Sequence, residues 1–112
     1  MEFHGVDVRK QFKRMRELAP AQYKAFLDFD AAAFKDGALS EKNKELMAVA
    51  VAHVTQCPWC IDVHTQRAIK AGASDAEIGE TIFVAMAMAA GAAWAHGGLA
   101  LQCVEAHRGA AR

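Results

Sequence analysis

The sequence predicts an all-α protein. Apolar residues recur at helical spacing along most of the chain, so that they gather on one face of each helix. No segment alternates apolar and polar residues as strands do. Glycine, proline and capping residues separate the periodic stretches. We therefore expect a bundle of about six helices, forming a single domain over residues 1–112.

The first two helices are expected on either side of Pro20. Val8, Phe12 and Met15 share one helical face before this proline. A second apolar pattern follows it and runs to Phe34. Because proline fits the first turn of a helix but not its interior, Pro20 marks the boundary.

The third and fourth helices are expected to flank the sequence Cys57-Pro58-Trp59-Cys60. Ser40 is a suitable N-cap for the third helix. Pro58 suits the first position of the fourth helix, which makes Cys57 its N-cap. Gly72 provides the stop. The two cysteines are thus predicted at the N-terminus of the fourth helix.

Two more helices are expected in the remainder of the chain. Residues 74–77 match a capping box, and the helix after it is expected to reach Trp94 or His96. A last helix is expected over residues 98–107. The longest apolar stretch, residues 82–95, is shorter than a membrane span and consists mainly of Ala, Met and Gly. We interpret it as a buried core helix.

Charge and composition exclude several classes of partner. Lysine plus arginine and aspartate plus glutamate number thirteen each, so no overall field attracts nucleic acid or anionic lipid. Residues 1–10 lack the apolar core of a signal peptide, and we expect a cytoplasmic protein with no membrane partner. Much of the apolar content is alanine, which buries little area per residue and favours association with further copies.

The spacing of Cys57, Cys60 and His64 indicates thiol-redox chemistry. An N-cap position favours an anion and so lowers the pKa of the Cys57 thiol. Cys60 follows three residues later, close enough for a disulfide. His64 lies one turn after Cys60, where its ring can accept the thiol proton. Cys60 is then the nucleophile, and Cys57 resolves its sulfenic acid into a disulfide.

Glu45 is the candidate partner of His64. It precedes Cys57 by roughly 18 Å of helix, and His64 returns about 10 Å if the two helices pack as an antiparallel hairpin. The remaining offset of roughly 8 Å predicts a Glu45–water–His64–Cys60 proton relay.

These four residues resemble the active-site pattern of the alkylhydroperoxidase D-like (AhpD-like) group within the carboxymuconolactone decarboxylase superfamily. The similarity extends from about Ala25 to Cys103. It implies an AhpD-like helical bundle, assembled as a homotrimer or homohexamer. It also implies a peroxidase in which Cys60 reacts with a hydroperoxide. Cys57 then resolves the oxidised Cys60, and Glu45 with His64 relays protons.

We expect a dithiol or lipoyl-type electron donor, and no cofactor, because the sequence has no Gly-rich phosphate loop or flavin fingerprint. One position differs, because Trp59 stands where the best-known member has a histidine. The decarboxylases of the superfamily lack the cysteine pair, so its presence argues against lactone decarboxylation.

Three alternatives remain open at this point. The cysteine pair and His64, with His53 or Cys103, are a possible zinc site in a binding module. The cysteines are also small hydrophobes that fill cores, as we expect of Cys103. Finally, the pair is compatible with a non-enzymatic redox switch.

Overall fold

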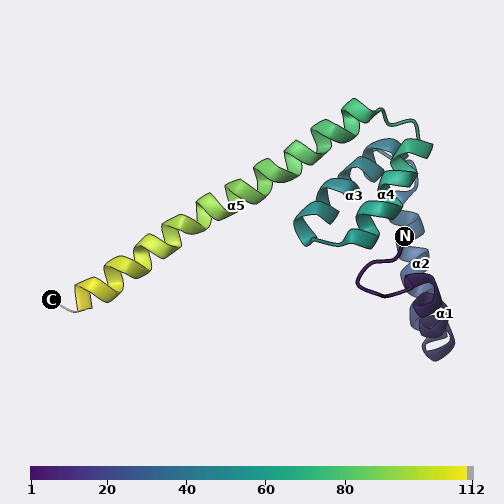
Figure 1. Ribbon diagram of the computed structural model, residues 1–112, viewed down its shortest axis with the longest axis horizontal. Helices are drawn as coiled ribbons and strands as arrows, with labels where there is room; N and C mark the ends of the chain where they lie inside the picture. Colours follow the sequence, from purple (N-terminus) through teal and green to yellow (C-terminus); the bar gives the residue numbers. More distant parts are fainter. Residues whose placement is uncertain (111–112) are drawn as a thin grey trace.

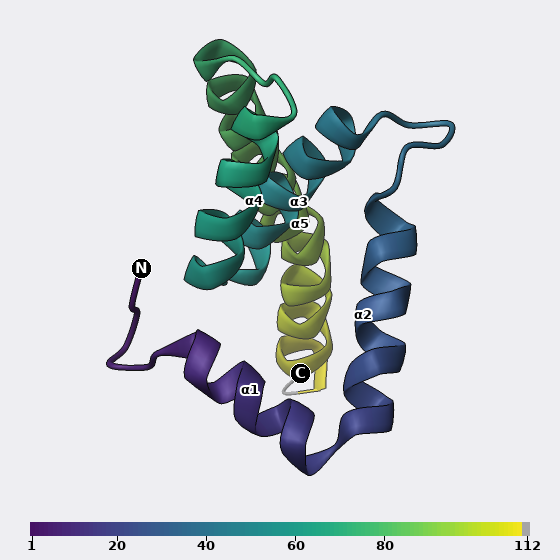
Figure 2. The same cartoon turned by 90° about the vertical axis from the view of Figure 1, so that its right-hand side faces the viewer.

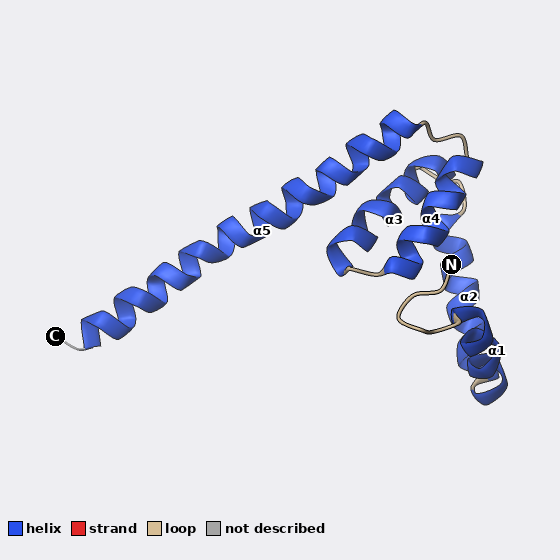
Figure 3. Ribbon diagram, viewed as in Figure 1, coloured by secondary structure: helices blue, strands red, loops and turns tan. Residues whose placement is uncertain are grey.

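The computed structural model describes residues 1–110, and all its regular elements are helices, which confirms the predicted class (Figure 1, Figure 3). Outside the helices the described residues contain one isolated β-bridge, between Phe3 and Val6. The helices are α1 (Val8–Leu18), α2 (Pro20–Phe34), α3 (Glu41–Thr55), α4 (Pro58–Lys70) and α5 (Asp75–Ala110).

The predicted capping residues begin the helices. The Ser40 hydroxyl accepts from the backbone N–H of Asn43 at the start of α3. Ser74 and Glu77 form the reciprocal capping box at the start of α5. These bonds satisfy amide groups that have no partner inside the helix, and they fix where each helix starts.

Helices α3 and α4 form a hairpin at the centre of the molecule, and the first part of α5 packs on α3 (Figure 1). The turn between α3 and α4 passes through Gln56, which has a left-handed conformation with φ 58°. The buried apolar side chains come from α3, α4 and α5 and are small. They are Val49, Ala52, Ala68 and Ala85.

Helices α1 and α2 form a separate arm beside this hairpin. The two helices meet at Pro20, as predicted, and the arm extends from the α3–α4 pair (Figure 2). Neither helix has a fully buried residue. The arm therefore leaves an apolar face open.

The predicted break between two C-terminal helices is wrong: α5 is one continuous helix of 36 residues, so residues 1–110 form five helices where about six were expected. Gly97 and Gly98 were expected to break it, but neither has the positive φ of a helix stop. Glycine inside a helix costs about 1 kcal/mol without ending it.

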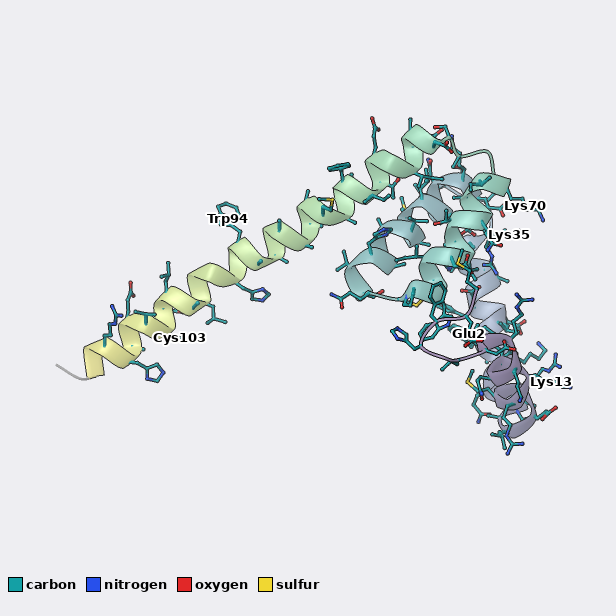
Figure 4. The ribbon with its side chains drawn as sticks, viewed as in Figure 1. Glu2, Lys13, Lys35, Lys70, Trp94 and Cys103 are labelled. Atoms are coloured by element: carbon teal, nitrogen blue, oxygen red, sulfur yellow. A yellow bond between two sulfur atoms is a disulfide. The ribbon has the colours of Figure 1, made fainter. Side chains whose placement is uncertain are left out.

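The prediction of a buried core helix over residues 82–95 is also wrong. Beyond Ala85 the helix leaves α3, and Trp94 is 85% exposed. Cys103, expected inside, is exposed on the same free part (Figure 4). By length and composition alone, α5 is long and apolar enough to cross a membrane, because the two predicted helices form one continuous segment.

Candidate functional site

The cysteine pair lies at the N-terminus of α4. Cys57 is the N-cap residue, and its sulfur accepts from the backbone N–H of Cys60. The two sulfurs lie at disulfide-bonding distance, with 5.3 Å between the Cα atoms. Pro58 occupies the first turn and loses no hydrogen bond there. The local sequence thus places both thiols on one turn of helix.

His64 and Glu45 are in direct contact. The imidazole Nδ1 lies 2.6 Å from the Glu45 carboxylate Oε2, across the α3–α4 hairpin. Glu45 is only 2% exposed, and it is the one charged residue that is fully buried in the described part of the chain. A buried carboxylate is stable only when it is paired and hydrogen-bonded, so this contact has a structural as well as a chemical role.

The predicted water between Glu45 and His64 is not needed. Helix α3 ends at Thr55 rather than at Cys57, so Glu45 lies about 15 Å from its end. His64 lies about 9 Å from the start of α4 at Pro58. The glutamate side chain spans most of the remaining offset of about 6 Å.

Phe34 is a site residue that the sequence did not reveal. Its ring stacks on the His64 imidazole, with centroids 4.9 Å apart and an interplanar angle of 20°. It comes from the last turn of α2, thirty residues earlier in the chain. As part of an ordinary apolar pattern, it gave no signal of this role.

Trp59 lies under the N-terminal segment. The rings of Phe3 and His4 contact it edge-on, at centroid distances of 6.1 and 5.7 Å. Its indole N–H is buried without a hydrogen-bond partner among the residues the structure describes. Trp59, one of the two residues between the cysteines, is therefore covered by a segment with no predicted role.

His64 lines one cavity, and its partner Glu45 lines another. A cavity of about 730 Å³ lies between the α1–α2 arm and α4, and both Cys60 and His64 line it. Its other walls are largely apolar. A second cavity, of about 760 Å³, is lined by Glu45 and by charged residues including Lys35 and Lys70. The thiol thus faces an apolar space, while the carboxylate faces a polar one.

Two partly exposed carboxylates have lowered pKa values. The ammonium of Lys42, 2.9 Å away, holds the pKa of Glu77 below its ordinary value. A hydrogen bond from Gln66 at 2.9 Å, together with the amino group of Met1, does the same for the pKa of Asp62. The Lys42–Glu77 pair joins the start of α3 to the start of α5.

The four-ligand zinc set is not assembled. Cys103 lies on the free part of α5, away from Cys57 and Cys60 (Figure 4). His53 donates to or accepts from its own helix, with Nδ1 2.7 Å from the Val49 carbonyl oxygen. Among residues 1–110 no three His, Cys, Asp or Glu side chains are placed to hold a metal ion.

The fold and the site together define an all-helical protein in which a histidine pairs with a buried glutamate and shares its helix with a bonded pair of cysteines. The family model described as "Carboxymuconolactone decarboxylase family" matches residues 20–102. The chain belongs to this family. The match spans α2 to α5 and so includes every residue of the predicted relay.

Relatives and solved structures agree with this assignment. The chain is 51% identical over 86 residues to "Uncharacterized protein 4 in cox locus" of Paracoccus denitrificans, which covers 77% of this chain and 78% of that protein. A carboxymuconolactone decarboxylase family protein from Legionella pneumophila, solved in its apo form, superposes with a TM-score of 0.72 and 37% identity, over 88% of each chain. A Methanobacterium thermoautotrophicum protein gives a TM-score of 0.73 and 29% identity, covering 80% of this chain and 97% of that one.

Proposed function

We propose that the protein is a thiol-dependent peroxidase that reduces organic hydroperoxides through a Cys57–Cys60 disulfide. One arrangement supports the proposal most. Cys60 and His64 line the same apolar cavity, Cys57 lies at bonding distance from Cys60, and Glu45 holds the other side of the imidazole. A nucleophile, a base and an orienting carboxylate are the groups that nucleophilic catalysis by a thiol requires.

In the oxidative half-reaction, His64 takes the thiol proton of Cys60. The thiolate attacks the outer peroxide oxygen, the O–O bond breaks, and the alkoxide leaves as an alcohol with the proton returned from His64. Cys60 becomes a sulfenic acid. The Cys57 thiol then attacks this sulfur, the S–S bond forms and water leaves.

In the reductive half-reaction, a dithiol donor of lipoyl type supplies two electrons and two protons. It exchanges with the Cys57–Cys60 disulfide through a mixed disulfide and leaves oxidised. The sum is hydroperoxide plus dithiol giving alcohol, water and donor disulfide. A reducing cytoplasm would provide such a donor.

Glu45 orients the imidazole. With its carboxylate at Nδ1, the ring holds its proton there and presents Nε2 to the cavity that contains Cys60. The carboxylate also stabilises the imidazolium that forms when the ring takes the thiol proton.

The test is steady-state consumption of cumene hydroperoxide with dihydrolipoamide as donor. The wild type is expected to turn over, and Cys60→Ser is expected to lose turnover entirely. Cys103→Ser is the matched control, because the third cysteine is exposed far along α5, and it should retain wild-type turnover. A wild type that is oxidised once and does not turn over would overturn the peroxidase and support the thiol-disulfide switch instead.

A further inference from the structure

The free part of α5 is an apolar helix without a partner. Between Glu80 and Glu105 it carries no acidic residue, lysine or arginine. Trp94 is 85% exposed and Leu101 66%, although both are large apolar side chains. Within the chain α5 packs on α3 and makes no comparable contact with another helix.

The chain as a whole is too open for a self-contained domain. Its accessible surface is 8732 Å², whereas a folded monomer of 12.1 kDa exposes about 6,000 Å². Its radius of gyration is 19.5 Å, whereas a compact domain of this length has about 13 Å. The excess of roughly 2,700 Å² per chain exceeds the share that a stable interface takes from each partner, about 800 Å².

A second apolar surface lies on the same chain, in the groove formed by the 730 Å³ cavity between the α1–α2 arm and α4. Phe12, Leu18 and Phe26 line it and are 44%, 68% and 62% exposed. Cys60 and His64 lie at its base on α4. The chain's own α5 runs away from this groove and does not cover it (Figure 1).

We propose that the groove is occupied by α5 of a second copy, whose apolar segment completes the wall of the site around Cys60 and His64. The 36 residues of α5 extend about 54 Å, far enough to reach beyond its own hairpin. Each copy carries both the helix and the groove, so two copies can exchange helices reciprocally and bury both surfaces. In this arrangement a single chain has an incomplete site.

A second copy accounts for more of the structure than a lipid bilayer does. A bilayer would cover α5 but leave open the groove on the short helices α1 and α2. The alanines and glycines of α5 also allow another helix to approach closely. One helix from a second copy, placed in the groove, buries both the apolar surface of α5 and that of the groove.

Closure of the groove would change the chemistry at Cys60. An apolar helix over the groove excludes water from the thiolate and encloses the alkyl part of a hydroperoxide. This consequence rests on the proposed peroxidase function, whereas the exchange of α5 does not. The experiments below separate the two.

The first experiment measures mass and turnover of a double variant, Leu99→Lys with Leu101→Lys. These leucines are 59% and 66% exposed and lie on opposite sides of α5. The variant should sediment as a 12.1 kDa monomer, while the wild type sediments at a multiple of that mass. Its turnover should fall about tenfold or more.

Leu39→Lys is the matched control. Leu39 is 44% exposed, outside α5 and away from the groove, so the same substitution should leave mass and turnover unchanged. An α5 variant that is monomeric and fully active would overturn the completion of the site, and an unchanged oligomer would overturn the interface.

The second experiment mixes one inactive protein with one of reduced turnover. Cys60→Ser has an intact α5 but no nucleophile, and the Leu99→Lys, Leu101→Lys variant has an intact site but a defective α5. After subunit exchange, the mixture should regain turnover, because α5 of the first completes the site of the second. A mixture whose turnover does not rise, although both parent proteins are folded by circular dichroism, would contradict the proposal.

The third experiment locates α5 without an activity assay. A photo-crosslinking amino acid replaces Trp94, and in a separate protein Leu99. Cross-links to peptides from α1, α2 or the start of α4 of another copy are expected, in buffer and in the presence of phosphatidylcholine vesicles. Cross-links to lipid alone would overturn the proposal in favour of a membrane. Because a failed peroxidase assay would leave these cross-links intact, the two proposals fail separately.

Discussion

The ring of Phe34 lies flat against the imidazole of His64, with centroids 4.9 Å apart. Glu45 holds the same imidazole by its Nδ1 edge at 2.6 Å. The ring is thus fixed on one face by α2 and at one edge by α3, although it belongs to α4. Its other nitrogen, Nε2, is the one left for the proposed proton transfer with Cys60, which lines the same cavity as His64.

Loss of the stacked ring should reduce turnover more than stability. Phe34→Leu removes an aromatic contact worth about 1 kcal/mol and frees the imidazole to rotate about its bond to Glu45. We expect a several-fold lower kcat, restored by Phe34→Tyr. Phe29→Leu, at a 70% exposed position on the same helix, should change neither quantity. Equal kcat in Phe34→Leu and Phe29→Leu would exclude a positioning role.

Removing His64 should leave a buried carboxylate without a partner. We expect His64→Ala to lower the free energy of unfolding at neutral pH by about 2 kcal/mol, less than for a wholly buried pair because His64 is 16% exposed. Turnover should fall by about 10²- to 10⁴-fold. The double variant with Glu45→Gln should recover most of the stability but none of the turnover. Chemical denaturation of the four proteins of the cycle measures this coupling.

The Lys42–Glu77 ion pair should make stability depend on pH. Because Lys42 lowers the pKa of Glu77 in the folded state, this carboxylate stabilises the fold at pH values above its ordinary pKa of 4.5. The contribution is lost as pH falls through the lower folded-state pKa. The difference in melting temperature between wild type and Glu77→Gln should therefore stay constant from neutral pH to near 4.5 and shrink as the pH falls further. Glu80→Gln, on the same helix without an ion pair in the described structure, should show no such trend.

Two glycines should respond to alanine with opposite signs. Gly72 has a φ of 98° after the end of α4, so Gly72→Ala should destabilise the protein by about 1 kcal/mol or more. Gly79 lies inside α5, and an added Cβ meets no atom of the chain within 4 Å. Gly79→Ala should therefore stabilise by roughly 1 kcal/mol. Unfolding of both variants in urea gives the comparison.

Local signals predicted the starts of the helices better than their burial. Ser40 and Cys57 accept hydrogen bonds from backbone N–H groups three residues later, and Pro20 acts through its fixed φ; such local effects are visible in sequence. The exposure of Trp94 and Cys103 was not visible, because an apolar helix has the same composition whether its partner is its own chain or another copy.

The candidate site divides in the same way. Cys57, Cys60 and His64 share one helix, so their spacing alone predicted their proximity. Placing Glu45 near His64 required the assumption of a helical hairpin. Counting residues along the two helices then overestimated the separation, so that a water molecule was predicted where the contact is direct. Phe34 lies across a tertiary contact that no periodicity encodes. The catalytic roles of all these residues stay predictions until turnover is measured.

The direct bond between Glu45 and His64 has a consequence for how the chain folds and for how its sequence can change in evolution. All four predicted site residues lie within one hairpin whose contacts are close in sequence, so this unit can form early and without the arm or the free part of α5. The chemistry and the access to it are therefore encoded in separate stretches of the chain. Apart from Phe34, substitutions in α1, α2 or α5 can accumulate and alter which molecules reach the thiol and how well water is excluded from it, while the four residues that carry the chemistry stay unchanged.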